Sequence, residues 1–226
     1  NGDIAYPVLV PNIKGLENAM AAGAREIAVF GAASETFSQK NINCSIDESI
    51  DRFEATATMA LDNGIKVRGY ISCVMGCPYE GSVSIAAVEH VARRLDEIGC
   101  YEVSLGDTIG TGNPRWTTEL IETLATNING IQLAVHFHDT YGQALANIYA
   151  ALQCGIAVID SSVAGLGGCP YARGASGNVA TEDVVYMLRG LGIECGIDLD
   201  ELVETGRWIC DQLDRPVTSR VNLAKP

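Results

Sequence analysis

The sequence predicts an α/β fold that forms part of a TIM, or (β/α)8, barrel. Short runs rich in valine and isoleucine alternate with amphipathic helical segments about every thirty residues, a pattern typical of a parallel sheet with helices on its outer side. Polar residues follow the ends of several of these runs. In a barrel, the carboxyl ends of the strands form the rim that carries functional groups, so the polar residues favour the same fold.

The apolar runs and the periodic segments define the expected elements in chain order. The expected strands are residues 6–10, 26–30, 66–74, 101–105, 131–138 and 157–163. The expected helices are residues 14–22, 47–61, 84–98, 116–126, 143–152 and 181–191, with a closing helix at 199–213. The helix at 84–98 has the clearest pattern, because its apolar residues recur with a period of about 3.6. No composition break divides residues 1–226, which we expect to form one catalytic barrel domain.

Two architectures fit this alternation: a doubly wound sheet and a barrel. The doubly wound sheet commonly binds dinucleotides through a G-x-G-x-x-G segment after its first strand, and no such segment follows residues 6–10. Six strand–helix units are too few for a closed eight-unit barrel. Because the chain opens on a strand, without a Met or a leading helix, we expect a barrel that lacks its first two units.

Composition and charge argue against two classes of partner. The 226 residues are 47% hydrophobic and 19% charged with a net charge of −13, whereas nucleic-acid binding requires a basic surface. No apolar run approaches the eighteen or so residues that a membrane helix needs. An anionic small molecule could still bind where basic residues converge. The candidates by position are Lys14, Lys40, Arg68 and Arg173.

The eight cysteines indicate neither a disulfide framework nor a structural zinc site. The chain is long enough to build a core without cross-links, and no C-x-x-C pair is present. We expect most of the thiols to be small buried side chains in a reducing compartment. Cys169 is the exception, because it lies between two glycines and a proline in a loop and has no core to pack against. We expect a functional thiol there.

His136 and His138 are candidates for metal ligands. They are two residues apart at the end of an expected strand, so both side chains point to the same face. An Asp or Asn from elsewhere would complete a nitrogen and oxygen ligand set suited to Mg²⁺, Mn²⁺ or Zn²⁺. The alternative is a pair of histidines hydrogen-bonded in the core. Asp107 also follows an expected strand, and it could be a ligand, a base or a turn former.

A glycine-rich segment, residues 165–183, carries further candidates. Its glycines and proline exclude a regular element over most of its length and let the backbone approach a ligand closely. Asn178 is either a metal ligand or, like Thr181, an N-cap of the helix that follows. Glu182 and Asp183 suit the positive end of that helix, and this can be their whole role.

Three segments resemble the 3-hydroxy-3-methylglutaryl-CoA lyase family. They are Gly31-Ala-Ala-Ser-Glu35, Val135-His-Phe-His-Asp-Thr-Tyr-Gly-Gln143, and the cysteine-bearing run from Gly165 to Asn178. The resemblance covers almost the whole chain, and the cysteine-bearing run is specific to this family. The His-x-His pair is shared with a wider group of metal-dependent lyases and aldolases built on TIM barrels.

The resemblance implies roles for the matching residues. The ligands of a divalent cation, Mg²⁺ or Mn²⁺, would be His136, His138 and Asn178. The catalytic residues would be Cys169, on a flexible loop, Asp107 and Glu182. The residues near the CoA moiety of the substrate would be Lys40 and Asn41.

The implied reaction is the cleavage of 3-hydroxy-3-methylglutaryl-CoA to acetyl-CoA and acetoacetate, a retro-Claisen step of leucine degradation and ketone body formation. The metal would bind the tertiary alcohol and a substrate carboxylate. A base would take the hydroxyl proton while the carbon–carbon bond breaks, and Cys169 would help to protonate the acetyl-CoA enolate. We also expect a homodimer or a higher homo-oligomer.

One element of the family has no match. The family's first strand carries an Arg-Asp-Gly element that supplies another metal ligand and a substrate-polarising arginine, and this chain aligns only from the third barrel strand onward. The end of the chain also lacks the cysteine-bearing tail of animal forms. This difference favours a bacterial-type enzyme in the cytoplasm, whereas a eukaryotic one would work in the mitochondrial matrix.

Two other functions stay open. Another metal-dependent aldolase or acyltransferase of the same barrel group would share the histidines, although Cys169 argues against it. A non-catalytic domain that binds a small molecule is the alternative outside enzymes, because the expected barrel is incomplete.

Overall fold

The computed structural model describes residues 4–128, 130–167 and 177–225. Within them, six parallel strands form one sheet in chain order. The strands are β1 (Val8–Leu9), β2 (Glu26–Ala32), β3 (Lys66–Ser72), β4 (Glu102–Asp107), β5 (Gln132–Phe137) and β6 (Val158–Asp160). A doubly wound sheet would reverse its strand order, so the observed order selects the barrel alternative and confirms an incomplete (β/α)8 barrel.

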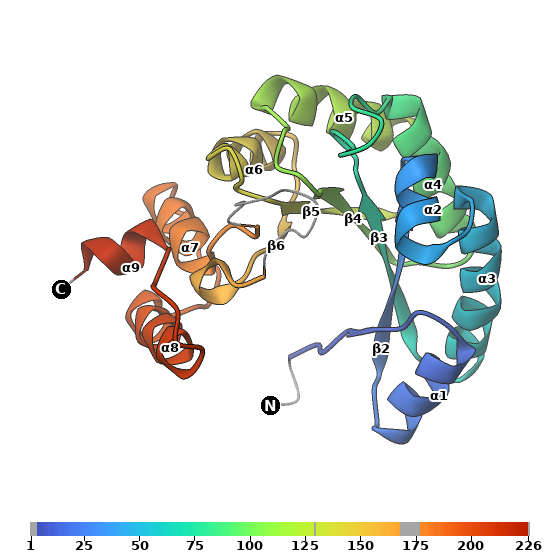
Figure 1. Cartoon of the computed structure of the whole chain (residues 1–226), viewed down its shortest axis with the longest axis horizontal. Helices are drawn as coiled ribbons and strands as arrows, with labels where there is room; N and C mark the ends of the chain where they lie inside the picture. Colours follow the sequence, from blue (N-terminus) through green and yellow to red (C-terminus); the bar gives the residue numbers. More distant parts are fainter. Residues whose placement is uncertain (1–3, 129, 168–176, 226) are drawn as a thin grey trace.

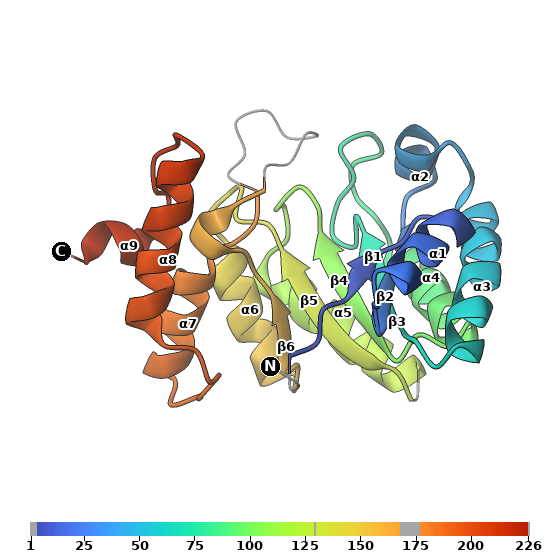
Figure 2. The ribbon, with the colours of Figure 1, turned by 90° about the horizontal axis from the view of Figure 1, so that it is seen from below.

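Helices follow the strands along the chain, and most of them lie along the outer side of the curved sheet (Figure 1). They are α1 (Ile13–Ala21), α2 (Glu35–Ile42), α3 (Ile46–Asp62), α4 (Ile85–Glu97), α5 (Pro114–Asn127), α6 (Ala144–Gln153), the 3₁₀ turn η1 (Val163–Gly165), α7 (Thr181–Gly190), α8 (Leu199–Gln212) and α9 (Arg220–Ala224). Figure 2 shows α1 and α3 towards one end of the molecule and α7, α8 and α9 at the other. In the described part of the chain, no helix combines the length and the apolar character needed to cross a membrane.

Side-chain caps fix where several helices begin. Ser45 and Glu48 form a capping box at the start of α3, in which each side chain accepts the backbone N–H of the other residue. Two short helices, α2 and α9, were not expected from the sequence. Their starts are capped by Ser34 and Ser219, but eight and five residues are too few to show a clear apolar period.

The first strand is shorter than the expected residues 6–10. Pro7 and Pro11 flank it, and a proline has no N–H to donate to a neighbouring strand. The side chains of Val8 and Leu9 are exposed. Among the described strands, β1 and β6 are the two edges of the sheet.

The strand register separates an apolar outer face from a polar inner face. On the outer face, Val67 and Ile71 are 1% exposed and belong to the core between sheet and helices. On the inner face, pairing places Arg68 of β3 beside Glu102 of β4. Because side chains alternate along a strand, the inner face is left for charged and polar groups, and the site is built there.

The helix α8 lies close to the start of α7 at Gly206. A Cβ atom on Gly206 would overlap Oε1 of Glu182 and would lie 2.7 Å from Nδ2 of Asn222. Both of these side chains are buried. Glu182 cannot move away freely, because its two carboxylate oxygens accept the Ala164 N–H at 3.0 and 2.9 Å.

We expect Gly206→Ala to lower the free energy of unfolding by about 1–3 kcal/mol, the usual cost of overpacking. The matched control is Gly190→Ala at the end of α7, where the added Cβ would meet nothing within 4 Å beyond its chain neighbours and the nearby backbone of its own helix. The control should leave stability unchanged or raise it by up to about 1 kcal/mol, because alanine is the better helix former. Urea unfolding measures both variants, and equal effects would contradict the close packing of α8 against Glu182.

Candidate metal and substrate site

His136 and His138 stand at the carboxyl end of β5. Their ring centroids are 5.5 Å apart. Parallel pairing places His136 between Gly106 of β4 and Asp160 of β6. Both rings line a cavity of about 600 Å³ on the inner face of the sheet. The expected pair of imidazoles therefore converges on a space that a ligand can enter.

The cavity combines apolar walls with a few polar groups. Leu9, Phe30 and Phe37 line its apolar side, and Asn41 lines it together with the two histidines. The structure thus brings Asn41, which the resemblance places near CoA, to the same space as the candidate metal ligands. Lys40 is not part of the lining, and its Nζ lies 4.9 Å from the centroid of the Tyr79 ring.

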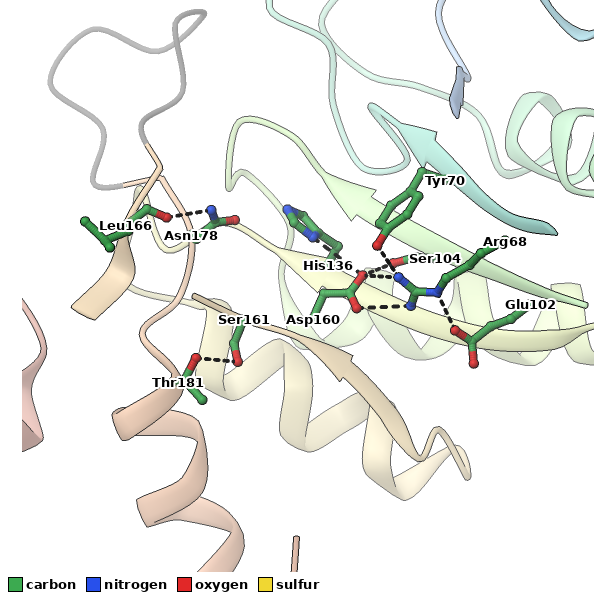
Figure 3. A network of polar contacts seen from close by, with 10 residues as sticks. All are labelled: Arg68, Tyr70, Glu102, Ser104, His136, Asp160, Ser161, Leu166, Asn178 and Thr181. Carbon is green, nitrogen blue, oxygen red and sulfur yellow. Dashed lines mark hydrogen bonds and ion pairs between the residues drawn. The ribbon is translucent and has the colours of Figure 1, made fainter. Parts of the chain in front are cut away.

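Asn178 is brought to the histidines by backbone pairing. It forms an isolated antiparallel bridge with His138. Its Nδ2 atom donates to the Leu166 carbonyl at 2.8 Å, and Figure 3 shows its amide oxygen on the opposite side, towards His136 in this view. The alternative role of Asn178 as a helix cap is not observed, because the N-cap of α7 is Ala180.

The donor set fits a divalent cation. The Nδ1 atoms of His136 and His138 are buried without a hydrogen-bond partner among the described residues. Burial, together with the neighbouring His136 ring, lowers the pKa of His138 to about 4, so this imidazole is neutral at pH 7 and able to ligate. The third candidate, Asn178, is an amide, so within the described residues no group of three His, Cys, Asp or Glu side chains forms a metal site. Two imidazoles and an amide oxygen suit a borderline or hard divalent cation.

Beside the histidines, Arg68 joins two carboxylates on the inner face. Its Nε donates to Oε1 of Glu102 at 2.5 Å, and its Nη1 and Nη2 donate to Oδ2 and Oδ1 of Asp160 at 3.1 and 3.0 Å (Figure 3). Ser104 donates to Oδ2 of Asp160 at 2.7 Å, and Arg68 also donates to the Tyr70 hydroxyl. These five residues form one network on the inner face. Arg68 is 5% exposed, so this buried pairing excludes the role in anion binding considered for it from sequence.

The groups of this network hold one another in fixed protonation states. Burial alone would raise the pKa of Asp160, but His136 and Arg68 outweigh it and lower this pKa to about 2. Burial would also lower the pKa of Arg68, whereas Asp160 and Glu102 raise it above its usual value. Burial and the charge of Asp160 raise the pKa of Tyr70 to about 12, so Tyr70 stays a neutral phenol. Asp160 is therefore a carboxylate at any pH near neutrality.

Sequence reasoning missed Glu102 and Asp160 as parts of the site. A signal was present, since Glu102 and Asp160 are acidic residues within or at the end of otherwise apolar strands. A charge at such a position is buried only with a partner, and the partner here is Arg68. The pairing of these charges could not be predicted from the sequence, because the curvature of the sheet brings β3 and β6 together.

Asp107 is fully buried and holds the turn that follows β4. Its two oxygens accept the N–H groups of Thr111 at 3.1 Å and Gly112 at 2.9 Å. Burial, only partly offset by these hydrogen bonds, raises the pKa of Asp107 to about 6. The contacts match the role of a turn former, one of the three roles that the sequence left open. The role of an active-site acid stays a prediction.

Glu182 is also fully buried, at the start of α7. Besides the Ala164 N–H, its carboxylate contacts Nδ2 of Asn222 at 3.4 Å. Ala164 has a φ of 55°, in the left-handed region that costs a non-glycine residue energy. Glu182 thus fixes a strained turn just before the segment that leads to Asn178. Its predicted role as an active-site acid is likewise not tested by these contacts.

Two predicted groups of the glycine-rich segment, Cys169 and Arg173, lie outside the described residues. Of the other basic candidates, Lys14 is exposed on α1, where it forms an ion pair with Glu17 at 3.0 Å. None of Lys14, Lys40 and Arg68 therefore lines the cavity. An anionic ligand would have to be held there by other groups.

Comparison with known proteins gives close relatives. The profile of the HMGL-like family matches residues 2–209. A protein of Danio rerio named 3-hydroxy-3-methylglutaryl-CoA lyase, cytoplasmic, is 60% identical over 222 residues, which are 98% of this chain and 66% of the relative. The chain thus spans about two thirds of the length of this relative.

Two solved structures share the fold over nearly the whole chain. The hydroxymethylglutaryl-CoA lyase of Pseudomonas aeruginosa is 57% identical with a TM-score of 0.96, over 99% of this chain and 75% of that protein. An HMG-CoA lyase from Acinetobacter baumannii, in complex with coenzyme A and 3-methylmalate, is 33% identical with a TM-score of 0.93, over 99% of this chain and 73% of that one.

Proposed function

The chain belongs to the HMGL-like family, and on this premise we propose that it is a divalent-metal-dependent carbon–carbon lyase. Its reaction would be the cleavage of 3-hydroxy-3-methylglutaryl-CoA to acetyl-CoA and acetoacetate. The observation that carries the proposal is that His136 and His138 line one cavity, while a backbone bridge places Asn178 beside His138. Product analysis with this substrate tests it, because an aldolase or acyltransferase of the same group would not release acetyl-CoA and acetoacetate in equal amounts.

His136, His138 and Asn178 are the proposed ligands, and Mg²⁺ or Mn²⁺ is the proposed cation. When bound there, the cation would polarise the oxygen atoms of the substrate and lower the pKa of its tertiary alcohol. The neutral imidazole of His138 is ready to ligate at pH 7. The hydrogen bond from Asn178 to Leu166 occupies the amide nitrogen and leaves the amide oxygen as the donor atom.

The cavity is proposed to bind and orient the acyl-CoA substrate. Its apolar side excludes water from the reacting end, while Asn41 and Thr108 offer polar contacts. Asn41 and Lys40 are neighbours on α2, so we assign this helix to the CoA moiety. The complex of the Acinetobacter baumannii enzyme with coenzyme A supports a CoA ester as the ligand.

Proton transfer requires a base for the hydroxyl group and an acid for the enolate of acetyl-CoA. Cys169 is the proposed acid, since its segment joins Gly165 to Asn178 beside the histidines. Asp107 is proposed as an active-site acid, because a pKa of about 6 suits proton exchange near neutral pH. Glu182 is proposed as a further acid, although its present contacts hold the turn at Ala164.

The quaternary structure and the compartment are further parts of the proposal. We propose a homodimer or a higher homo-oligomer, which size-exclusion chromatography of the full-length protein tests. A cytoplasmic location would agree with the name of the Danio rerio relative, and the mitochondrial matrix is the proposed compartment if the source is a eukaryote with a targeting segment.

Removing both imidazoles should abolish stoichiometric metal binding. In the His136→Ala/His138→Ala double variant, one amide and water are left to hold the cation, and such a site is weak. The control is His90→Ala, because His90 is exposed on α4, where its Nε2 lies 2.8 Å from Asp47. Elemental analysis after dialysis measures bound metal. A double variant that keeps one metal per chain would show that the assignment is wrong.

Replacing the loop thiol should affect turnover rather than folding. In Cys169→Ser the pKa of the donor rises far above that of a thiol, so kcat should fall by roughly 10²–10⁴-fold, as for other general acids. The KM and the thermal stability should change little. The control is Cys100→Ser, because Cys100 is buried and burial raises its pKa to about 12, so its loss should lower stability more than turnover. Normal turnover by Cys169→Ser would refute a role in proton transfer.

A further inference from the structure

Asp160 and His136 lie side by side in the sheet, and their contact differs from the other contacts of the network. The two residues are partners in the register of β5 and β6. Nδ1 of His136 lies 3.6 Å from Oδ2 of Asp160, an ion-pair distance that is too long for a hydrogen bond. This Nδ1 atom is buried without a hydrogen-bond partner among the described residues. Asp160 is therefore the acceptor that a small rotation of the ring would engage.

The carboxylate of Asp160 cannot turn to meet the ring. Arg68 donates to both of its oxygens, at 3.0 and 3.1 Å, and this paired geometry fixes the plane of the carboxylate. Ser104 donates a further hydrogen bond to Oδ2 at 2.7 Å. With three donors in place, the position of Asp160 is set by β3 and β4, and the ring of His136 must adapt to it.

The contact between Asp160 and His136 favours one tautomer of the neutral imidazole. A carboxylate only accepts hydrogen bonds, so the nitrogen that faces it must carry the proton. A proton on Nδ1 leaves the lone pair of a neutral imidazole on Nε2. The carboxylate of Asp160 also makes the adjoining imidazole a stronger electron-pair donor toward a cation.

We propose that Asp160 is a positioning residue: held by Arg68 and Ser104, it fixes the orientation of His136 and the tautomer in which Nε2 is free to ligate a cation. The inference rests on the proposed function, in which His136 is a metal ligand. In this proposal, the buried charges of the inner face not only pair with one another but also orient a metal ligand.

Two variants separate this role from a structural one. Asp160→Asn and Glu102→Gln each remove one carboxylate charge from Arg68 with little change in shape, but the carboxylate of Asp160 is the one that faces His136. The full-length protein is titrated with Mn²⁺, and free Mn²⁺ is followed by electron paramagnetic resonance. We expect Asp160→Asn to bind Mn²⁺ about 10–100-fold more weakly. Glu102→Gln leaves the carboxylate that faces His136 in place, so it should lose clearly less Mn²⁺ affinity than Asp160→Asn.

A second measurement needs no substitution. In the metal-free protein with ¹⁵N-labelled histidine, long-range ¹H–¹⁵N spectra report which ring nitrogen is protonated. We expect the proton of His136 on Nδ1 in the unchanged protein and in Glu102→Gln, and a shift towards Nε2 in Asp160→Asn.

The outcomes distinguish the two proposals. A proton on Nε2 in the unchanged protein would overturn the positioning role, as would equal losses of Mn²⁺ affinity in both variants or no loss in Asp160→Asn. If the protein without substitutions binds no Mn²⁺, the proposed metal function is refuted. The tautomer of His136 in the metal-free protein would still decide the positioning role. If Asp160→Asn fails to fold, as judged by circular dichroism, the tautomer of the unchanged protein decides alone.

Discussion

The buried pairing of Arg68 with Glu102 and Asp160 is the interaction on which the inner face of the sheet depends. A guanidinium at this depth is tolerated because carboxylates surround it, and loss of one partner from such a buried pair typically costs about 3–5 kcal/mol. Arg68 belongs to β3, Glu102 to the adjacent β4, and Asp160 to β6 at the edge of the described sheet. The contact across the inner side is made because the sheet curves, so the pairing and the barrel-like shape support each other.

The same pairing links the interior to the rim. Asp160 meets His136 in register, and His136 shares the cavity with His138 and Asn41. A second set of contacts holds the other side of the site, where Glu182 fixes the turn at Ala164 and Asn178 returns to His138. Buried acids in this chain therefore serve to place backbone and side chains, whether or not they also transfer protons.

Much of the fold could be predicted from the sequence, because the periodicities are strong where the elements are long. The helices from α3 to α8 fall within one or two residues of their expected bounds. The apolar residues of α3 to α7 join the main core, whereas those of α8 form a separate cluster with α7. Short elements escaped the prediction, since α2 and α9 are defined by a serine cap rather than by a stripe. The third strand ends at Ser72, two residues before its expected end, because Cys73 adopts a φ of 62°.

The candidate site was predictable only in part. The spacing of His136 and His138 gives a shared face directly, and the structure places both at the cavity. Asn178 could not be assigned from sequence, because a ligand and a helix cap use the same residue type, and the backbone bridge to His138 is a tertiary feature. The partners of Asp107 and Asp160 depend on turns and on strands far apart in the chain, which local patterns do not encode.

The central claim is that this framework gathers His136, His138 and Asn178 around one divalent cation. Diffraction from crystals of the full-length protein soaked with Mn²⁺, recorded at the manganese absorption edge, tests it most directly. The account predicts one strong anomalous peak within ligand distance of the two imidazoles and the Asn178 amide oxygen. An absent peak at saturating Mn²⁺, or a peak at another place in the molecule, would contradict it.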